Sequence, residues 1–199
     1  QAIEETIVRM RDKLPTPELV HLFTNCFPNN LDKAVVYEVG EDGLDDTFIL
    51  TGDIEAMWLR DSGAQVWPYV ALLGDDEPLQ HLIRGVINRQ LKCLVIDPYA
   101  NAFNRKPFHG EWQSDNTDMT DDLWERKWEL DSPCYVLRLV HGYWQQTGDD
   151  ELVKSDLFLA ALEKVLNVFV EQQKWNGQRT SYKFTRLTVA LHDTMANYG

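Results

Sequence analysis

Two short stretches of the sequence concentrate side chains that could carry chemistry. Residues 51–62 (TGDIEAMWLRDS) place Asp53, Trp58, Arg60 and Asp61 close together, and residues 124–132 supply a second group of carboxylates, cations and tryptophans. Aromatic faces beside carboxylates and a guanidinium suit a sugar. Its hydroxyls take paired hydrogen bonds, while the C–H face of its ring lies on an aromatic side chain. The two stretches therefore predict a polar ligand cleft.

Carboxylates in such a cleft favour glycoside cleavage as the chemistry. One carboxylic acid would protonate the leaving oxygen, and a second carboxylate would activate water or attack the sugar carbon. The sequence does not select a pair among the four candidates, which are Asp53, Asp61, Glu129 and Asp131.

A purely structural role is the alternative for part of this set. Asp61 and Ser62 lie just before an apolar helical run, where either could cap a helix, with Gln65 completing a capping box. Ser132 followed by Pro133 reads in the same way, since proline favours the first helical position.

The elements that must position these residues occur twice. Trp-x-x-Asp-Ser, an apolar helical run, Gly-Asp-Asp-Glu and a second apolar helical run span residues 58–94 and again 128–169. The glycine can end one helix in the left-handed conformation, and the aspartates can cap the next. This repeat predicts antiparallel helical hairpins that bury their apolar faces on one another. Both Trp-x-x-Asp-Ser segments should then share one rim with the connection 97–127, and the Gly-Asp-Asp-Glu turns should occupy the other.

The rest of the chain adds little regular structure to these hairpins. Helical spacing predicts helices over residues 3–14 and from 17 to about 27, and residues 35–54 read as a small β-hairpin. The connection 97–127 has no convincing helical pattern, and connections of this length are usually functional or disordered. Its large aromatic residues favour order. No linker composition appears, so residues 1–199 are expected to form a single domain.

Composition excludes several classes of partner. The net charge of −13 and the pI near 4.7 disfavour nucleic acid and anionic membranes, which bind basic patches. No apolar run approaches the length of a membrane span, and no signal peptide opens the sequence, so the compartment is unassigned. Cys26, Cys93 and Cys134 are too few and too widely spaced for a disulfide framework, and are expected to be free and buried.

Motifs for metals, nucleotides and serine nucleophiles are missing from the sequence. The acidic run 115–122 fails as a calcium loop, because Thr120 is a poor ligand and Leu123 stands where glycine is required. The histidines lack zinc-ligand spacing, and GxSxG, P-loop and GxGxxG patterns do not occur. We expect no metal site and no cofactor.

Three segments resemble a known enzyme family. TGDIEAMWLRDS (51–62), DPYANAFN (97–104) and DDLWERKWELDSPCYVLRL (121–139) closely resemble signature segments of the glycoside hydrolase family 125 exo-α-1,6-mannosidases, and SYKFTRLTVALHDTM (181–195) also looks like that family. The resemblance implies a mainly all-α fold in which the helical hairpins form part of the (α/α)6 toroid of six-hairpin glycosidases.

The resemblance also implies an activity and a set of binding residues. Members are metal-independent, inverting hydrolases that remove single non-reducing α-1,6-linked mannose from N-glycans or mannan. Carried over by position, the residues expected to bind substrate are Asp53, Trp58, Arg60, Asp61, Asn101, Asn104, Lys127, Trp128, Glu129 and Asp131.

The family's catalytic pair has no counterpart in this sequence. Its general acid lies in a later Arg-Pro-Ser-Asp-Asp segment and its general base is a glutamate nearer the C-terminus, and neither segment occurs here. The resemblance therefore predicts the N-terminal half of a catalytic domain, inactive by itself, which would associate with the C-terminal part of the same enzyme. Two other functions stay open at this point: a catalytically inactive mannose- or glycan-binding module, and an α-hairpin scaffold for protein partners.

Overall fold

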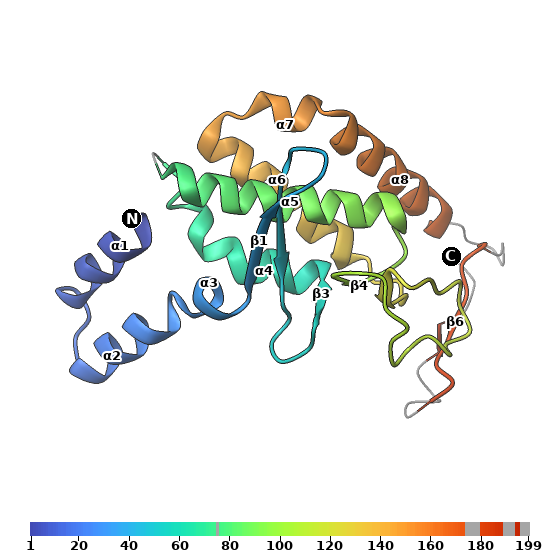
Figure 1. Ribbon diagram of the computed structural model, residues 1–199, viewed down its shortest axis with the longest axis horizontal. Helices are drawn as coiled ribbons and strands as arrows, with labels where there is room; N and C mark the ends of the chain where they lie inside the picture. The colour runs from blue at the N-terminus through green and yellow to red at the C-terminus, as the bar shows by residue number, and fades with distance from the viewer. Residues whose placement is uncertain (75, 174–179, 189–193, 196–199) are drawn as a thin grey trace.

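The computed structural model describes residues 1–74, 76–173, 180–188 and 194–195. This part of the chain is mainly helical, with short antiparallel strands (Figure 1). Its helices are α1 (Ala2–Arg11), α2 (Pro17–Cys26), α3 (Asn29–Lys33), α4 (Leu59–Val70), α5 (Glu77–Ile96), α6 (Asp131–Thr147), α7 (Asp150–Lys154) and α8 (Asp156–Gln172). Its strands are β1 (Val35–Val39), β2 (Asp45–Ile49), β3 (Ala56–Trp58), β4 (Ala102–Asn104), β5 (Leu123–Glu125), β6 (Phe184–Thr185) and β7 (Thr194–Met195).

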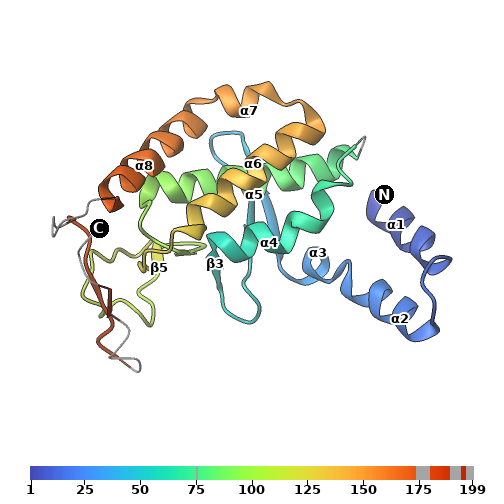
Figure 2. The ribbon, with the colours of Figure 1, turned by 180° about the vertical axis from the view of Figure 1, so that it is seen from behind.

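The central helices follow the repeat in the sequence. α4 packs against α6, and α5 packs against α8, so the first helices of the two hairpins are neighbours and so are the second helices. Figure 2 shows α7 and α8 arching over α5 and α6, with α1 and α2 at one end of the molecule and the C-terminal strands at the other. The predicted helical hairpins are confirmed.

The Gly-Asp-Asp-Glu turns have the predicted local chemistry. Gly74 and Gly148 have positive φ angles of 27° and 68°, a backbone conformation that glycine adopts without steric cost. Asp76 accepts a hydrogen bond from Leu79 N at 3.2 Å, and Asp149 accepts one from Leu152 N at 3.1 Å. Each turn therefore contains its own helix cap.

The predicted second helix of the second hairpin, with Phe158 to Phe169, is α8, and the short helix α7 precedes it. Ser155 has an extended backbone with ψ of 148°, which separates α7 from α8. Its hydroxyl accepts a hydrogen bond from Phe158 N at 3.1 Å. Serine competes for such bonds outside helices, and it restarts the helix here as an N-cap.

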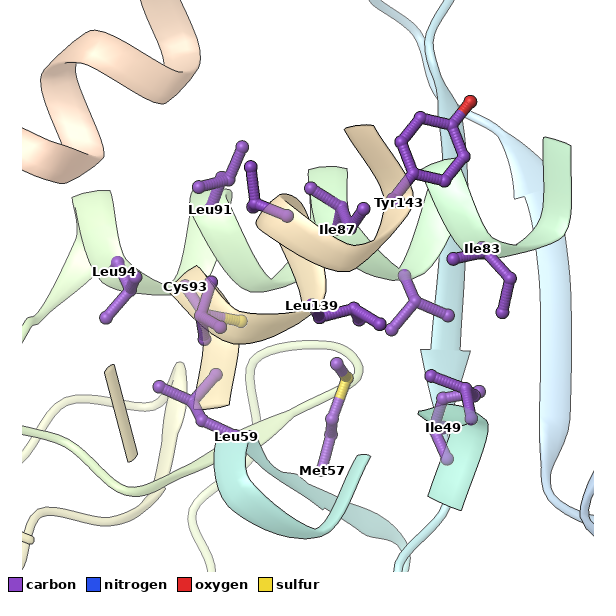
Figure 3. Close-up of a cluster of buried hydrophobic side chains, with 14 of the residues drawn as sticks. Ile49, Met57, Leu59, Ile83, Ile87, Leu91, Cys93, Leu94, Leu139 and Tyr143 are labelled. Atoms are coloured by element: carbon purple, nitrogen blue, oxygen red, sulfur yellow. The ribbon is translucent and has the colours of Figure 1, made fainter. Parts of the chain in front are cut away.

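The core lies where α5 crosses the other elements. Figure 3 shows aliphatic side chains of α5 meeting residues from β2, α6 and the segment that enters α4. The labelled members of this cluster are Ile49, Met57, Leu59, Ile83, Ile87, Leu91, Cys93, Leu94, Leu139 and Tyr143. Of the three free cysteines only Cys93 is buried, and burial raises its pKa to about 12. The expected burial of Cys26 and Cys134 is wrong, because both are exposed.

The alternative role of helix cap, considered for Ser62 and Ser132, is wrong. α4 begins at Leu59 and α6 at Asp131, so Ser62 and Ser132 lie inside the first turn. Ser62 Oγ donates to Trp58 O at 2.6 Å, and neither helix has a side-chain cap.

The chain enters α4 directly from β3, and this explains the missing cap. Leu59 N donates to Asn101 O at 3.0 Å, so a neighbouring segment supplies the acceptor that a cap would provide. Gln65 does not form the expected capping box, because its Nε2 donates to Leu50 O at 3.1 Å.

The connection 97–127 is ordered and contains strands that the sequence did not predict. β4 pairs with β3 and with β5, giving a three-stranded antiparallel sheet at the rim where α4 and α6 begin. Each strand has only three residues, which is too short for an alternating pattern to be recognised. The order expected from the aromatic residues is confirmed.

The N-terminal elements agree with prediction apart from their ends. α1 stops at Arg11 rather than continuing to residue 14, and α2 ends at Cys26. β1 and β2 form the predicted hairpin, with Gly43 at φ 75° in its turn. No described helix has the length and apolarity needed to cross a bilayer.

Replacing Gly85 with alanine should destabilise the fold. A Cβ atom at this position of α5 would lie 3.1 Å from Thr47 N and 3.2 Å from Asp46 C, and would also meet Thr47 Oγ1. Because β2 backbone cannot move away easily, we expect Gly85→Ala to lower the free energy of unfolding by about 1–3 kcal/mol in denaturant titrations. Gly63→Ala is the control, since its Cβ would meet its nearest atoms only at 3.5 Å. Equal effects of the two substitutions would contradict this packing.

The β-hairpin should be held to α5 in a pH-dependent way. His81 Nδ1 lies 2.7 Å from Asp45 Oδ2, and Tyr37 donates to Asp45 Oδ1 at 2.6 Å. The hydrogen bond to Asp45 raises the pKa of His81 above 6.5, so its stabilising contribution is complete below pH ~6.5 and is lost as pH rises through the folded-state pKa.

The measurement is the free energy of unfolding of wild type and His81→Gln between pH 5.5 and 9. Their difference should stay within about 1 kcal/mol, because the pair is partly exposed, and should shrink as the pH rises. The exposed His21→Gln serves as control. A difference that does not vary with pH would refute the ion pair.

Candidate functional site

A single arginine gathers three of the predicted carboxylates. Arg60 Nη1 donates to Glu129 Oε2 at 2.8 Å and lies 3.3 Å from Asp131 Oδ2, while Nη2 lies 3.4 Å from Asp61 Oδ2. We call these four residues the Arg60 cluster. It joins the two Trp-x-x-Asp-Ser segments, so their predicted meeting at one rim is confirmed.

Helix packing positions the Arg60 cluster. Arg60 and Asp61 lie in the first turn of α4, directly after β3, and Asp131 is the first residue of α6. Because α4 packs along α6, the two helix starts face each other. Carboxylates near helix N-termini also interact favourably with the helix dipole.

The cluster is electrostatically unbalanced and reaches solvent. Burial alone would lower the pKa of Arg60, but the three carboxylates around it raise that pKa above its ordinary value. Three negative charges therefore share one positive charge. Side-chain exposure runs from 27% for Glu129 to 46% for Asp131, so a ligand can reach these oxygens. Asp61 Oδ2 is buried and accepts no hydrogen bond from the described residues.

Asn101 lies beneath the rim and joins three segments rather than lining a cleft. It is 1% exposed, its Nδ2 donates to Glu125 Oε2 at 2.5 Å, and its Oδ1 accepts from Lys127 N at 3.1 Å. Its backbone carbonyl accepts from Leu59 N. Asn101 thus links the start of α4 to the segment that carries Glu129.

A buried arginine that the sequence prediction omitted supports the same layer. Arg186 bonds Glu125 Oε1, and its Nε lies 3.3 Å from Asp115 Oδ2. Its guanidinium lies 3.7 Å from the ring centre of Trp112. Arg186 falls within the family-like segment 181–195, but its partners are more than 60 positions away in sequence, so no local spacing indicated the contact.

A second arginine is packed among aromatic rings. Arg126 Nε donates to Asp97 Oδ2 at 2.6 Å, and its guanidinium lies 5.3 Å from the ring centre of Tyr99 and 5.5 Å from that of Tyr182. Burial raises the pKa of the Tyr182 hydroxyl, which donates to Arg126 O and accepts from Trp128 N at 2.7 Å. This packing fixes the backbone immediately before Glu129.

Trp128 and Lys127 lie against this aromatic cluster. The Trp128 ring makes edge contacts with Tyr99 and Phe169, at centroid distances of 5.7 Å and 6.3 Å. Lys127 Nζ lies 5.9 Å from the ring centre of Phe184. Trp58, in β3, pairs with Ala102 and is also partly buried.

The other predicted residues lie apart from the Arg60 cluster. Asp53 is exposed in the turn between Thr51 and Ile54, and its carboxylate has no hydrogen-bond or ion-pair partner in the described chain. Asn104 Nδ2 donates to three backbone carbonyls, those of Phe108, Asp121 and Leu123. The structure therefore brings four of the ten predicted residues into the Arg60 cluster.

A pocket of about 250 Å3 lies at the end of the β3–β4–β5 sheet that is away from the Arg60 cluster. It contains none of the Arg60 cluster residues, and its lining consists of Glu55, Asn104, Arg105, Lys106, Pro107, Phe108 and Trp124. Within the described ranges, no group of three histidine, cysteine or acidic side chains is arranged to hold a metal ion.

Comparisons with known proteins match nearly all of the chain. The family model described as metal-independent alpha-mannosidase (GH125) covers residues 16–199. The Meiotically up-regulated gene 157 protein of Schizosaccharomyces pombe is 36% identical over 180 residues, which are 86% of this chain and 35% of that protein.

A solved structure from Streptococcus pneumoniae is 40% identical, with a TM-score of 0.83 over 99% of this chain and 44% of its own. It is described as a metal-independent alpha mannosidase in a non-productive complex with alpha-1,6-mannobiose. The chain thus spans about a third of the curated relative and less than half of the solved structure.

Sequence and fold agree with these comparisons. The family match includes both copies of the helical repeat and every member of the Arg60 cluster. The structural match confirms the predicted six-hairpin glycosidase architecture for the hairpins that this chain contributes. The chain belongs to the metal-independent α-mannosidases of glycoside hydrolase family 125.

Proposed function

We propose that this chain is the N-terminal half of an (α/α)6 catalytic domain that removes terminal mannose. The reaction would be metal-independent and inverting, on α-1,6-linked mannosides such as those of N-glycans or mannan. The observation that carries this proposal is the Arg60 cluster, which places one guanidinium and three carboxylates at the rim of a family 125 fold. The solved relative with mannobiose supports the linkage.

In this proposal the Arg60 cluster binds the hydroxyl groups of the terminal mannose. Carboxylate oxygens accept hydrogen bonds from hydroxyl groups, and a guanidinium donates them in a fixed planar arrangement. A partly exposed cluster with three carboxylates to one cation has acceptor capacity left for a ligand. Asp61 contributes to this capacity, because its side chain is 37% exposed.

The catalytic acid and base would come from the remaining part of the enzyme. Inversion requires two carboxyl groups about 6.5–9.5 Å apart, with water between one of them and the sugar. Glu129, Asp131 and Asp61 instead surround one guanidinium. That arrangement suits holding a sugar better than it suits delivering a proton to a leaving group. Asn101, Glu125 and Arg186 would act as positioning residues for the rim.

Removing the central guanidinium should abolish efficient turnover. In the full-length protein acting on α-1,6-mannobiose, we expect Arg60→Ala to lower kcat/KM by about a hundredfold or more, because three carboxylates lose their shared cation. The measurement is released mannose. Arg84→Ala is the matched control, since Arg84 forms an ion pair with Asp149 at 3.4 Å away from the Arg60 cluster.

The same assay separates the alternatives. Wild-type protein that binds mannose without releasing it from mannobiose would establish a binding module. If the protein neither binds nor hydrolyses mannosides, the α-hairpin scaffold for protein partners is the hypothesis that remains. Equal activity of Arg60→Ala and Arg84→Ala would remove the Arg60 cluster from the mechanism.

Asp61 should matter for sugar binding rather than for helix capping. The N-cap residue of α4 is Trp58, so Asp61→Asn should leave the melting temperature within a few degrees of wild type. Loss of a charged acceptor should weaken mannose affinity by roughly tenfold or more. Asp149→Ala is the control for capping, because Asp149 caps α7. This substitution should lower the free energy of unfolding by about 1 kcal/mol and leave mannose affinity unchanged. A less stable Asp61→Asn that binds mannose normally would return Asp61 to a structural role.

A further inference from the structure

The segment that carries Glu129 to the rim has no regular secondary structure. β5 ends at Glu125 and α6 begins at Asp131, and residues 126–129 belong to no strand or helix that the structure describes. Regular strand or helix bonding therefore does not set the direction of this backbone. Backbone N–H and C=O groups that leave water need partners, so the contacts that other segments make with residues 126–128 decide where Glu129 lies.

The hydroxyl of Tyr182 holds this backbone at two points. It donates to Arg126 O at 3.2 Å and accepts from Trp128 N at 2.7 Å. Asn101 Oδ1 accepts from the backbone N of the residue between them at 3.1 Å. One hydroxyl group thus spans three consecutive residues, and the last of these immediately precedes Glu129.

The ring of Tyr182 is itself fixed, so it cannot follow a moving backbone. It is 2% exposed and lies parallel to the ring of Tyr99, with centroids 4.8 Å apart and 5° between the two planes. The end of α8 holds Tyr99 in turn, because the Tyr99 hydroxyl donates to Glu171 Oε2 at 2.8 Å. Burial raises the pKa of the Tyr182 hydroxyl, which therefore stays protonated and able to donate at neutral pH.

A displacement of the backbone next to Glu129 would reach the Arg60 cluster directly. Arg60 Nη1 donates to Glu129 Oε2 at 2.8 Å, whereas its guanidinium lies 3.3 Å from Asp131 and 3.4 Å from Asp61. Hydrogen bonds between charged groups depend on direction as well as distance. A misplacement of about 1 Å in a group that holds substrate can lower the rate roughly a hundredfold.

We propose that Tyr182 is a positioning residue for Glu129. Its hydroxyl fixes the backbone of residues 126–128, so that the Glu129 carboxylate faces Arg60 and the sugar. This inference rests on the proposed function, in which the Arg60 cluster binds the terminal mannose. Tyr182 acts without touching the substrate, because its side chain is buried beneath the rim.

The test is a double-mutant cycle in the full-length protein acting on α-1,6-mannobiose, with released mannose as the measurement. Tyr182→Phe keeps the ring and removes only the hydroxyl, and we expect it to lower kcat/KM about tenfold when Glu129 is present. In a Glu129→Ala background the same substitution should change kcat/KM by less than twofold, because no carboxylate remains to be positioned. A merely structural role would lower kcat/KM equally in both backgrounds.

Tyr69→Phe is the matched control. Tyr69 is 1% exposed, and its hydroxyl also donates to a backbone carbonyl, Phe27 O, at 2.5 Å. It lies at the opposite end of α4 from Arg60. We expect Tyr69→Phe to lower the melting temperature about as much as Tyr182→Phe does, which shows that both variants fold, and to change kcat/KM by less than twofold.

An unchanged kcat/KM in Tyr182→Phe, or an equal loss in the two backgrounds, would overturn the positioning role. If the wild type hydrolyses no mannoside, the proposed function fails by itself. A crystal structure of Tyr182→Phe then decides the positioning role without activity. Loss of the 2.8 Å contact between Arg60 Nη1 and Glu129 Oε2 would support it, and a retained contact would overturn it.

Discussion

The rim of this protein depends on one charge-sharing arrangement, the guanidinium of Arg60 held among three carboxylates. The partners come from both copies of the helical repeat, so the interaction requires that α4 and α6 lie side by side with their first turns level. That alignment in turn requires the apolar contact of both helices with α5. The core and the site are therefore two consequences of the same helix packing.

Beneath the rim, polar groups are buried in pairs rather than singly. Arg186 with Glu125, and Arg126 with Asp97, each neutralise a charge that would be costly to bury alone. Asn101 joins this layer to the start of α4 through its backbone and to Glu125 through its side chain. Such paired groups hold backbone segments in fixed positions, which a sugar-binding rim requires because hydroxyl recognition depends on direction.

The parts of the fold that could be predicted are those with local causes. The Gly-Asp-Asp-Glu turns, the hairpin β1–β2 and the order of the central helices all follow from residue spacing, and the meeting of Arg60 with Asp131 follows from the repeat. Strands β4 and β5 and the contact of Arg186 with Glu125 have long-range causes, so no spacing indicated them. The misplaced cap at Ser62 shows the same limit, because Asn101 supplies from a distance the acceptor that a cap would supply locally.

The two rims consequently differ in how much change each can tolerate. On the rim of Gly74 and Gly148, each turn closes with a glycine and a capping aspartate of its own. The contacts that these aspartates make elsewhere, Asp76 with Ala2 N at 2.7 Å and Asp149 with Arg84 at 3.4 Å, do not involve the Arg60 cluster. On the opposite rim, α4 takes its first hydrogen bond from Asn101, which is more than 40 residues away. Fusion partners, affinity tags and loop grafts therefore belong on the glycine rim, which contains none of the residues proposed to bind sugar.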